Sequence, residues 1–336
     1  MATRAVAADD YACLDAILGV SRVFRLTRPD ETDTPFLYKG SENRGLRSIR
    51  WSGPKPLGPS EQTLLLVLHR LLHRTSPAAA GRCPSDLLHD LQIVGDYGAP
   101  VLHSEIRWTQ LVRALGKSRR GGRTTRLIRE SLQRLADVTV TVVSLDQRHS
   151  SRLIASEAGR QTIRVALCPR LSERLIAAHL GTGNGLFSII SLTERSRLTS
   201  DPAKLLHAWL SVWLRQGRSR TIRVTTLEQH VWSHPPHPAN RGRRRAQLLD
   251  AIGQIAALPM WEVSVDSDIV TVARTANKPA RRSRSARTSP KTRRSGRVAH
   301  QSMRSADQTL VHPSACIEKS SESCEFGFSY QPILTG

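Results

Sequence analysis

Residues 240–274, NRGRRRAQLLDAIGQIAALPMWEVSVDSDIVTVAR, carry the pattern that decides the fold class. The first half has helical periodicity, with Asn240 as the expected N-cap and an apolar stripe that ends before Pro259. The second half alternates apolar and polar residues on both sides of residues 266–268, which is typical of a β-hairpin. A basic helix that follows a shorter helix at residues 225–232 and precedes a hairpin has the element order of a winged helix.

An earlier part of the chain repeats this order, as an internal duplication would. A short helix is expected at residues 108–116, the basic turn KSRRGGR follows it, and a longer helix is expected over residues 124–136. The alternating segment VTVTVVSL at residues 138–145, with a return strand near residues 152–154, is predicted to be the hairpin of this unit. The sequence therefore predicts an α+β protein with two tandem winged-helix domains.

Both longer helices are expected to be apolar on one side and polar or basic on the other. The expected buried stripes consist of Leu127, Ile128, Leu132 and Leu135 on the first helix, and of Leu248, Leu249, Ile252, Ile255 and Ala256 on the second. The opposite sides carry Arg126, Arg129 and Gln133 on the first helix, and Arg243, Gln247 and Gln254 on the second. One charged helix face is usually just solvated, but a one-signed basic face that occurs twice favours contact with DNA.

The domain boundaries follow from shifts in composition. We expect an N-terminal arm at residues 1–40, winged-helix domains at residues 41–158 and 159–276, and a disordered basic tail at residues 277–336. The arm is expected to be loose, with one short helix near residues 14–18. The tail begins with a segment, residues 276–305, that has ten Lys and Arg and no acidic residue, which is typical of disorder.

Three segments around the two helical units complete the expected organisation. A buried helix is predicted over residues 61–74, with Pro59 at its first position. Residues 75–100 are expected to form a variable loop, because Pro and Gly punctuate them. A strand at residues 161–167 is assigned to the start of the second domain, and a helix is expected from Asp201 as its N-cap.

The charge of the chain indicates a polyanionic partner. The 336 residues include 50 Lys and Arg against 28 Asp and Glu, which gives a net charge of +22 and a pI near 11.2. Eleven of the basic and four of the acidic residues lie from Lys278 onward, so residues 1–277 keep a charge of +15. Only 4% of the residues are aromatic, which favours binding through phosphates over stacking of single-stranded bases.

Several other protein classes are disfavoured by the sequence. No apolar run is long enough for a transmembrane helix, no signal peptide is visible, and five scattered Cys suggest reduced thiols. The segment LGKS at residues 115–118 lacks the first Gly of a phosphate-binding loop, because Leu111 stands at that position. The His69/His73 pair and the His residues of the turn at 230–237 lack acidic or Cys partners at ligand spacing. We therefore expect no catalytic site, no metal and no cofactor.

Seven segments, taken together and in order, resemble one known family. They are SGPKPLG (52–58), RALG (113–116), IRESLQRLADVTVTVV (128–143), IRVALCPRL (163–171), KLLHAWLSVWL (204–214), TLEQHVW (226–232) and the helix led by RRR (243–258). They are similar to segments of the RepC-type replication initiators of IncQ-like plasmids, over roughly residues 46–275. The turn HPPHP before the last helix is longer than the family pattern, which affects the bases that the following helix would read.

The resemblance implies two winged-helix domains that bind directly repeated origin sequences, called iterons, in double-stranded DNA. It also implies opening of the adjacent AT-rich DNA, partnership with a plasmid helicase and primase, and location in the bacterial cytoplasm with the plasmid or nucleoid. Self-association, as a dimer or as an array on the iterons, is a further expectation, and no membrane partner is expected. Two alternatives are a winged-helix transcriptional regulator and a helicase-recruiting scaffold that binds DNA only through its tail.

The residues expected to contact DNA lie on the two longer helices and just before them. Arg126, Arg129 and Gln133 are expected to face one major groove, and Arg243 and Gln247 the next. The residues expected mainly at phosphates are Arg119, Arg120, Arg123, Arg241, Arg244 and Arg245. Thr124, Thr125 and Asn240, at the helix starts, complete the predicted interface.

Overall fold

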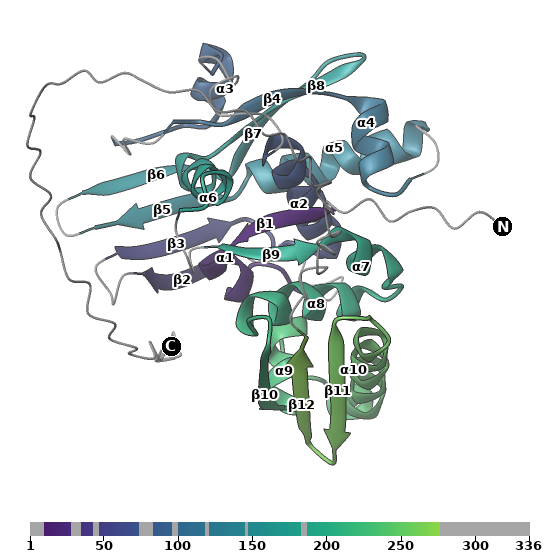
Figure 1. Ribbon diagram of the computed structural model, residues 1–336. Coiled ribbons are helices and arrows are strands. Elements are labelled where there is room, and N and C mark those ends of the chain that lie inside the picture. Colours follow the sequence, from purple (N-terminus) through teal and green to yellow (C-terminus); the bar gives the residue numbers. More distant parts are fainter. Residues whose placement is uncertain are drawn as a thin grey trace, which may run out of the picture. The chain divides into compact units, whose positions relative to one another are not determined.

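The computed structural model describes eight segments of the chain, all within the compact unit Met1–Ala280 (Figure 1). The described residues are 10–27, 35–42, 47–73, 83–95, 100–117, 121–144, 147–182 and 187–275. The predicted tail at 277–336 lies outside them. Among the described helices, none combines the length and apolar character that crossing a bilayer requires.

The last part of the described chain is a winged helix, as predicted. Its elements are α8 (Asp201–Trp213), β10 (Arg218–Arg223), α9 (Val224–Val231), the 3₁₀ helix η3 (Pro238–Asn240), α10 (Arg241–Ala256), β11 (Trp261–Asp266) and β12 (Ile269–Arg274). The antiparallel sheet has the order β10-β12-β11. Ser267 adopts a φ of 56° in the tight turn of the β11–β12 hairpin, and α10 packs on α8 and β11.

The first helical unit has the same element order and the same sheet order. Its helices are α2 (Pro59–His73), α4 (Trp108–Ala114) and α5 (Gly122–Ala136), and its strands are β4 (His103–Arg107), β7 (Ile154–Ala158) and β8 (Thr162–Leu167). The antiparallel order β4-β8-β7 matches β10-β12-β11, because in both sheets the last strand lies between the first and the middle one. The predicted fold class of two winged-helix units is therefore confirmed.

The hairpin of the first unit differs from the predicted one. Residues 138–154 do form a hairpin, β5 (Thr139–Val143) with β6 (Arg148–Arg152), but β5 also pairs with β3 (Arg47–Gly53). With β2 (Phe36–Glu42), these strands make a separate sheet of order β2-β3-β5-β6. The strand expected at the start of the second domain is β8, and its pairing with β4 and β7 places it in the first unit instead.

The N-terminal segment is packed and not loose, at least over residues 10–27. Strand β1 (Tyr11–Asp15) pairs with β9 (Phe187–Ser191), and the predicted short helix is α1 (Ala16–Val20). Leu14 and Leu18 are fully buried. Beyond α1, the Arg25 N–H donates to Leu57 O at 2.8 Å and the Leu26 N–H donates to Val231 O at 2.8 Å. This segment therefore bonds to both helical units, which the sequence pattern did not indicate.

Three more helices surround these units. They are α3 (Ser85–Asp90), α6 (Pro169–His179) and α7 (Leu192–Arg197). Helix α3 lies in the part of the chain that was expected to be a loop, and its Leu87 packs in a small cluster with Leu91 and Ala155. The helix predicted from Asp201 is α8, but Ser200 is its N-cap, and the Ser200 side chain accepts from the Ala203 N–H.

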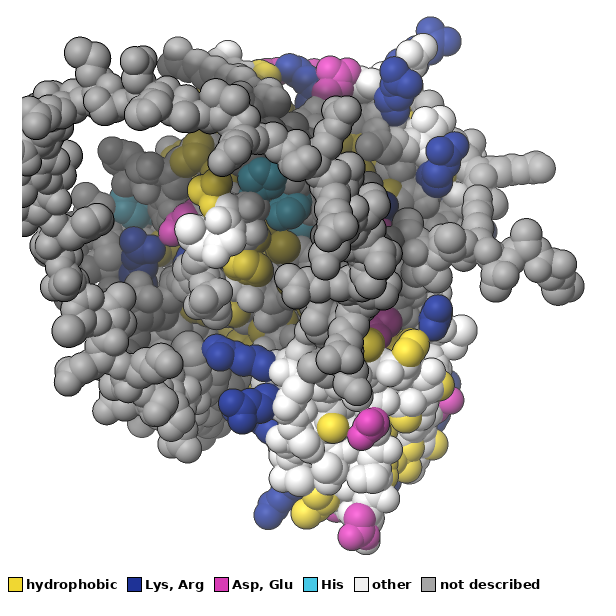
Figure 2. All heavy atoms as spheres, in the orientation of Figure 1, with side chains coloured by type: hydrophobic (Ala, Val, Ile, Leu, Met, Phe, Trp, Pro, Cys, Tyr) yellow, Lys and Arg dark blue, Asp and Glu magenta, His cyan; other side chains and the backbone are white. Residues whose placement is uncertain are grey.

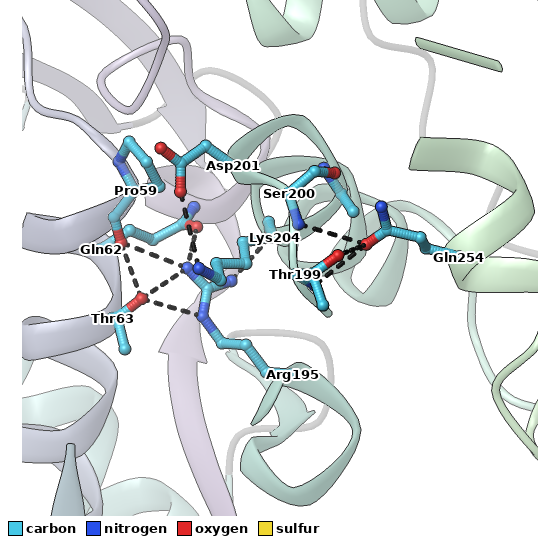
Figure 3. Close-up of polar contacts among 10 residues, drawn as sticks. Pro59, Gln62, Thr63, Arg195, Thr199, Ser200, Asp201, Lys204 and Gln254 are labelled. Atoms are coloured by element: carbon cyan, nitrogen blue, oxygen red, sulfur yellow. Dashed lines mark hydrogen bonds and ion pairs between the residues drawn. The ribbon is translucent and has the colours of Figure 1, made fainter. Parts of the chain in front are cut away.

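Polar contacts join α2, α7, α8 and α10 (Figure 3). Arg195 of α7 is buried, and its guanidinium donates to Gln62 Oε1 at 2.9 Å and to Lys204 O at 2.6 Å. Burial lowers the pKa of Arg195 to about 9. Near the start of α8, Gln254 Oε1 of α10 accepts from the Thr199 N–H at 3.0 Å. Gln254 was expected on the DNA-facing side of its helix, but the structure assigns it to this joint.

Candidate nucleic-acid interface

Helix α5 presents its polar face to solvent. Arg123, Arg126, Arg129 and Gln133 are exposed, and Ile128, Leu132 and Leu135 are buried on the opposite side. Leu127, which was expected in the buried stripe, is 50% exposed. The reason is angular, because at 100° per residue Leu127 lies outside the arc that Ile128, Leu132 and Leu135 define. Ser131 lies between Leu127 and that arc and is buried.

The exposed side chains of α5 have short-range partners that hold them on the helix surface. Arg126 Nε lies 3.0 Å from Glu130 Oε1, and Gln133 Nε2 donates to Asp137 Oδ1 at 2.9 Å. The Arg129 guanidinium lies over the Trp108 ring, 5.5 Å from its centroid. An open hollow at the start of the helix is lined by Gly121, Gly122, Thr125, Arg126 and Arg129. Exposed i,i+4 pairs of this kind contribute only about 0.3–0.5 kcal/mol, so these groups are available to a ligand.

The other predicted residues at the start of α5 fall into two groups. Thr124 and Thr125 are partly exposed in its first turn. Arg119 and Arg120 lie outside the described residues.

The basic run at the start of α10 divides into exposed and internally bound arginines. Arg241, Arg243 and Gln247 are exposed, and their side chains make no hydrogen bond or ion pair with the part of the chain that the structure describes. Arg244 donates to His234 O at 2.9 Å and to the His234 ring, and lies over Trp232 at 5.4 Å.

Arg245 connects α10 to the hairpin turn. It donates to Ser267 O at 2.8 Å and to Asp268 Oδ1 at 3.1 Å. Arg244 and Arg245 therefore have defined positions in the fold, which sequence reasoning did not distinguish from those of the other arginines. Asn240 is the N-cap residue of α10, as expected, but its side chain makes no capping hydrogen bond to the helix.

The two helices bury the same pattern of positions. Ile128, Ser131, Leu132 and Leu135 on α5 correspond in spacing to Leu248, Ala251, Ile252 and Ile255 on α10. By this correspondence Arg123 is equivalent to Arg243, whereas Leu127 is equivalent to Gln247 and Arg129 to Leu249. Leu249 is 36% exposed, and Ala256 is exposed as well, although both were expected to be buried. Each exposed helix face thus combines an arginine with one leucine, and an exposed apolar group can contact the methyl group of thymine.

A buried carboxylate positions α5 on α2. Glu61 Oε2 accepts from the Gly58 N–H at 2.8 Å, which satisfies a backbone donor at the start of α2. Glu61 Oε1 accepts from Ser131 Oγ at 2.6 Å and pairs with Arg134, both on α5. The sequence placed Glu61 only at the positive end of a helix. The sequence feature that could have indicated the role of Glu61 is Ser131, a polar residue beside the apolar stripe of α5.

The histidines have structural contacts. His69 Nδ1–H donates to Cys13 O at 2.7 Å, and burial lowers the pKa of His69 to about 4. His230 stacks on Trp209 with ring centroids 4.1 Å apart, and burial lowers its pKa to about 3. Within the described segments, no three His, Cys, Asp or Glu side chains gather in a way that could hold a metal ion.

A family model supplies the observation that decides the family. The model described as "Replication protein C (RepC)" matches residues 37–270, which is more than half of the chain. The chain belongs to the RepC family. This match confirms the resemblance of the sequence to RepC-type replication initiators, and the chain is therefore a replication protein. None of the curated proteins compared matches the chain.

Solved structures that resemble this RepC protein are distant in sequence. Domains 2 and 3 of RctB match with a TM-score of 0.47 and 12% identity, over 75% of this chain and 95% of that chain. The Pi initiator protein, solved in complex with iteron DNA, matches with a TM-score of 0.43 and 12% identity, over 64% of this chain and 89% of that chain.

Proposed function

We propose that this RepC-family protein initiates plasmid replication by binding directly repeated origin sequences in double-stranded DNA. Helices α5 and α10 would each enter a major groove, and the β11–β12 hairpin would lie along the adjacent backbone. The observation that carries the proposal is the duplication itself. Each helix exposes arginine on one face and buries an apolar wedge on the other, in the same unit order.

The side chains divide into three roles in this proposal. Arg126, Arg129 and Gln133 on α5, and Arg243 and Gln247 on α10, would read base edges. Arg119, Arg120, Arg123 and Arg241, with Thr124, Thr125 and Asn240, would contact phosphates. Arg244 and Arg245 are assigned a positioning role, because their guanidinium groups already bond to His234 and to the hairpin turn. Any phosphate contact of theirs would be made with the remaining N–H groups.

Two recognition helices in one chain suit a repeat of about two helical turns. Successive major-groove faces lie about 10 bp apart on one side of the duplex. Binding of several copies side by side would bend the DNA, which costs on the order of 1–6 kcal/mol per site, and would favour opening of neighbouring AT-rich DNA. Helicase and primase would then load on the opened strands, in the bacterial cytoplasm. Self-association on the repeats is part of the proposal.

The test compares one base-reading and one phosphate-binding arginine on a duplex that the protein selects from a random library. Arg126→Ala should weaken the selected duplex by about 1–3 kcal/mol and relax the preference at one base pair. Arg241→Ala should weaken selected and random duplexes alike and reduce the salt slope by about 0.9. Equal effects of both variants on both duplexes would refute the assignment of roles.

The same selection separates the proposal from its two alternatives. An initiator should select direct repeats, whereas inverted repeats would indicate a transcriptional regulator. Deletion of residues 276–336, which removes the whole predicted tail, should leave sequence-specific binding intact. Loss of all specific binding on this deletion would instead support a scaffold that uses only its tail.

A further inference from the structure

A second basic surface lies on β10 and on the residues just before it, away from α5 and α10. It consists of Arg215, Arg218, Arg220 and Arg223, which we call the β10 surface, and all four residues are exposed. Strand β10 pairs only with β12 in its sheet, so its outer edge has no strand partner among the described residues. The segment 215–223, RQGRSRTIR, contains four arginines and no acidic residue.

The charge of this surface is not compensated within the fold. Within the part of the chain that the structure describes, the guanidinium groups of these four arginines form neither an ion pair with a carboxylate nor a hydrogen bond. The Arg220 guanidinium lies over the half-buried Trp213 ring, 5.5 Å from its centroid, which orders it at the surface. Asp268, at the end of the neighbouring hairpin, is already bound to Arg245. Four exposed positive charges without counterions attract a polyanion.

The β10 surface and α10 lie at opposite edges of the same unit. The sheet order is β10-β12-β11, and α10 packs against β11. Figure 1 shows β10 on one side of this unit and α10 on the other, and Figure 2 shows Lys and Arg side chains gathered on the side where β10 runs. A duplex held by α10 would therefore leave the β10 surface uncovered.

We propose that the β10 surface binds the phosphates of a second DNA segment while α10 holds the first. Arg218 and Arg220 point to the same side of the strand, about 6.6 Å apart along it, whereas Arg223 points to the other side. Arg218 and Arg220 can therefore contact separate phosphates of one backbone. The proposed segment is a second duplex, because the surface offers arginines for phosphates while the ring beside them, Trp213, is half-buried beneath Arg220 and gives no platform for single-stranded bases. The inference rests on the proposed function only for the first segment, which α5 and α10 would hold.

The test is a capture experiment with the full-length chain. An immobilised 40-bp random-sequence duplex is saturated with protein and washed, and a fluorescent second probe is added, either a 40-bp duplex or a 30-nucleotide dT strand. The variant carries R215Q, R218Q, R220Q and R223Q together. The control carries K39Q, R50Q, R148Q and R197Q, which removes the same charge from other exposed positions. Exposed substitutions of this kind change stability by about 0.5 kcal/mol or less, and a thermal melt checks this.

We expect the β10 variant to bind the immobilised duplex within about twofold of the unchanged chain and to capture the second probe at least about tenfold more weakly. Each lost contact should lower the salt slope of duplex capture by about 0.9, and a loss confined to the single-stranded probe would contradict the assignment to a duplex. The control should behave as the unchanged chain. Equal capture by all three proteins would overturn the proposal, and so would parallel loss of both binding steps. Capture does not depend on sequence, so failure of the iteron proposal would not change this result.

Discussion

Glu61→Gln tests how the fold positions α5, the first of the two helices proposed to read DNA. Glu61 is 3% exposed and accepts from three donors, the Gly58 N–H, Ser131 Oγ–H and the Arg134 guanidinium. Glutamine keeps the shape but replaces one acceptor oxygen with a donor NH₂ group. The NH₂ group of the amide must therefore face another hydrogen-bond donor, and the negative charge that attracts Arg134 is lost.

The structure sets the size of the effect. If the amide NH₂ faces α5, Ser131 can rotate and accept from it, while Arg134, which is 44% exposed at its side chain, turns to water. The loss is then about one charge-assisted hydrogen bond, or 1.5–3 kcal/mol. For a folded part of this size, 1 kcal/mol lowers Tm by about 2–4 °C. We also expect weaker DNA binding, because α5 loses its polar anchor on α2.

The assay is urea unfolding with DNA binding measured in parallel, and the control is Glu130→Gln. Glu130 is exposed on the same helix and pairs with Arg126, so its replacement should cost only about 0.3–0.5 kcal/mol. A double-mutant cycle with Arg134→Ala isolates the pair. An unfolding free energy for Glu61→Gln equal to that of Glu130→Gln would refute the reasoning. Lower stability with unchanged DNA affinity would limit Glu61 to a role in folding.

Three further outcomes are expected. The pKa values of about 4 for His69 and about 3 for His230 lie below the ordinary 6.5, so both side chains should contribute their full stabilisation above pH 6.5. The free energy of unfolding should then fall as the pH decreases toward 4, by about 1.4 kcal/mol per pH unit for each histidine. Urea unfolding at pH 7.5 and 5.0 measures this change, and a flat profile contradicts it. Gly253→Ala should stabilise the chain by about 0.5–1 kcal/mol, because Gly253 is exposed on α10 with open space around it; a decrease in Tm would show a hidden clash. Arg245→Ala should loosen the hairpin turn, seen as faster amide exchange of Ser267 and Asp268, while the β10 strand amides stay protected.

Local signals predicted most of the helices and one hairpin. Helix α4 ends near Gly116, which adopts a φ of 71°, and α2 begins at Pro59, as turn and capping preferences predict. The β11–β12 hairpin follows from strict alternation around a tight turn. These features depend on neighbours in sequence, so a single chain is enough to read them.

Pairing between distant segments could not be predicted in the same way. Strands β5 and β8 lie in alternating segments, whereas β6 (RHSSR) contains no apolar residue. Only the pairing of β8 with β4 and β7 shows which hairpin belongs to the first winged helix. The N-terminal segment was misjudged for a similar reason, since β1 depends on β9, more than 170 residues away. Each partner alone has too few residues to signal a sheet.

The candidate site was predicted at the level of the helix and not at that of every side chain. Arg126, Arg129, Arg243 and Gln247 are exposed as expected, whereas Leu127 was placed on the wrong face. The error arises because the apolar stripe expected on α5 spans a wider angle than the helix face that is buried. Ser131 is buried beside that face, where it bonds to Glu61.

Tethered DNA cleavage tests the central claim, that α5 and α10 of one chain enter successive major grooves. An iron chelate is attached to Leu127→Cys or to Gln247→Cys, both of which are exposed positions. Cys316 and Cys324 are replaced by Ser in both proteins, and each labelled protein is bound to a direct-repeat duplex that the unchanged protein selects. The account predicts two cleavage centres, one from each position, about 10 bp apart on the same face of the duplex. Cleavage from only one position, or centres that coincide, would contradict it.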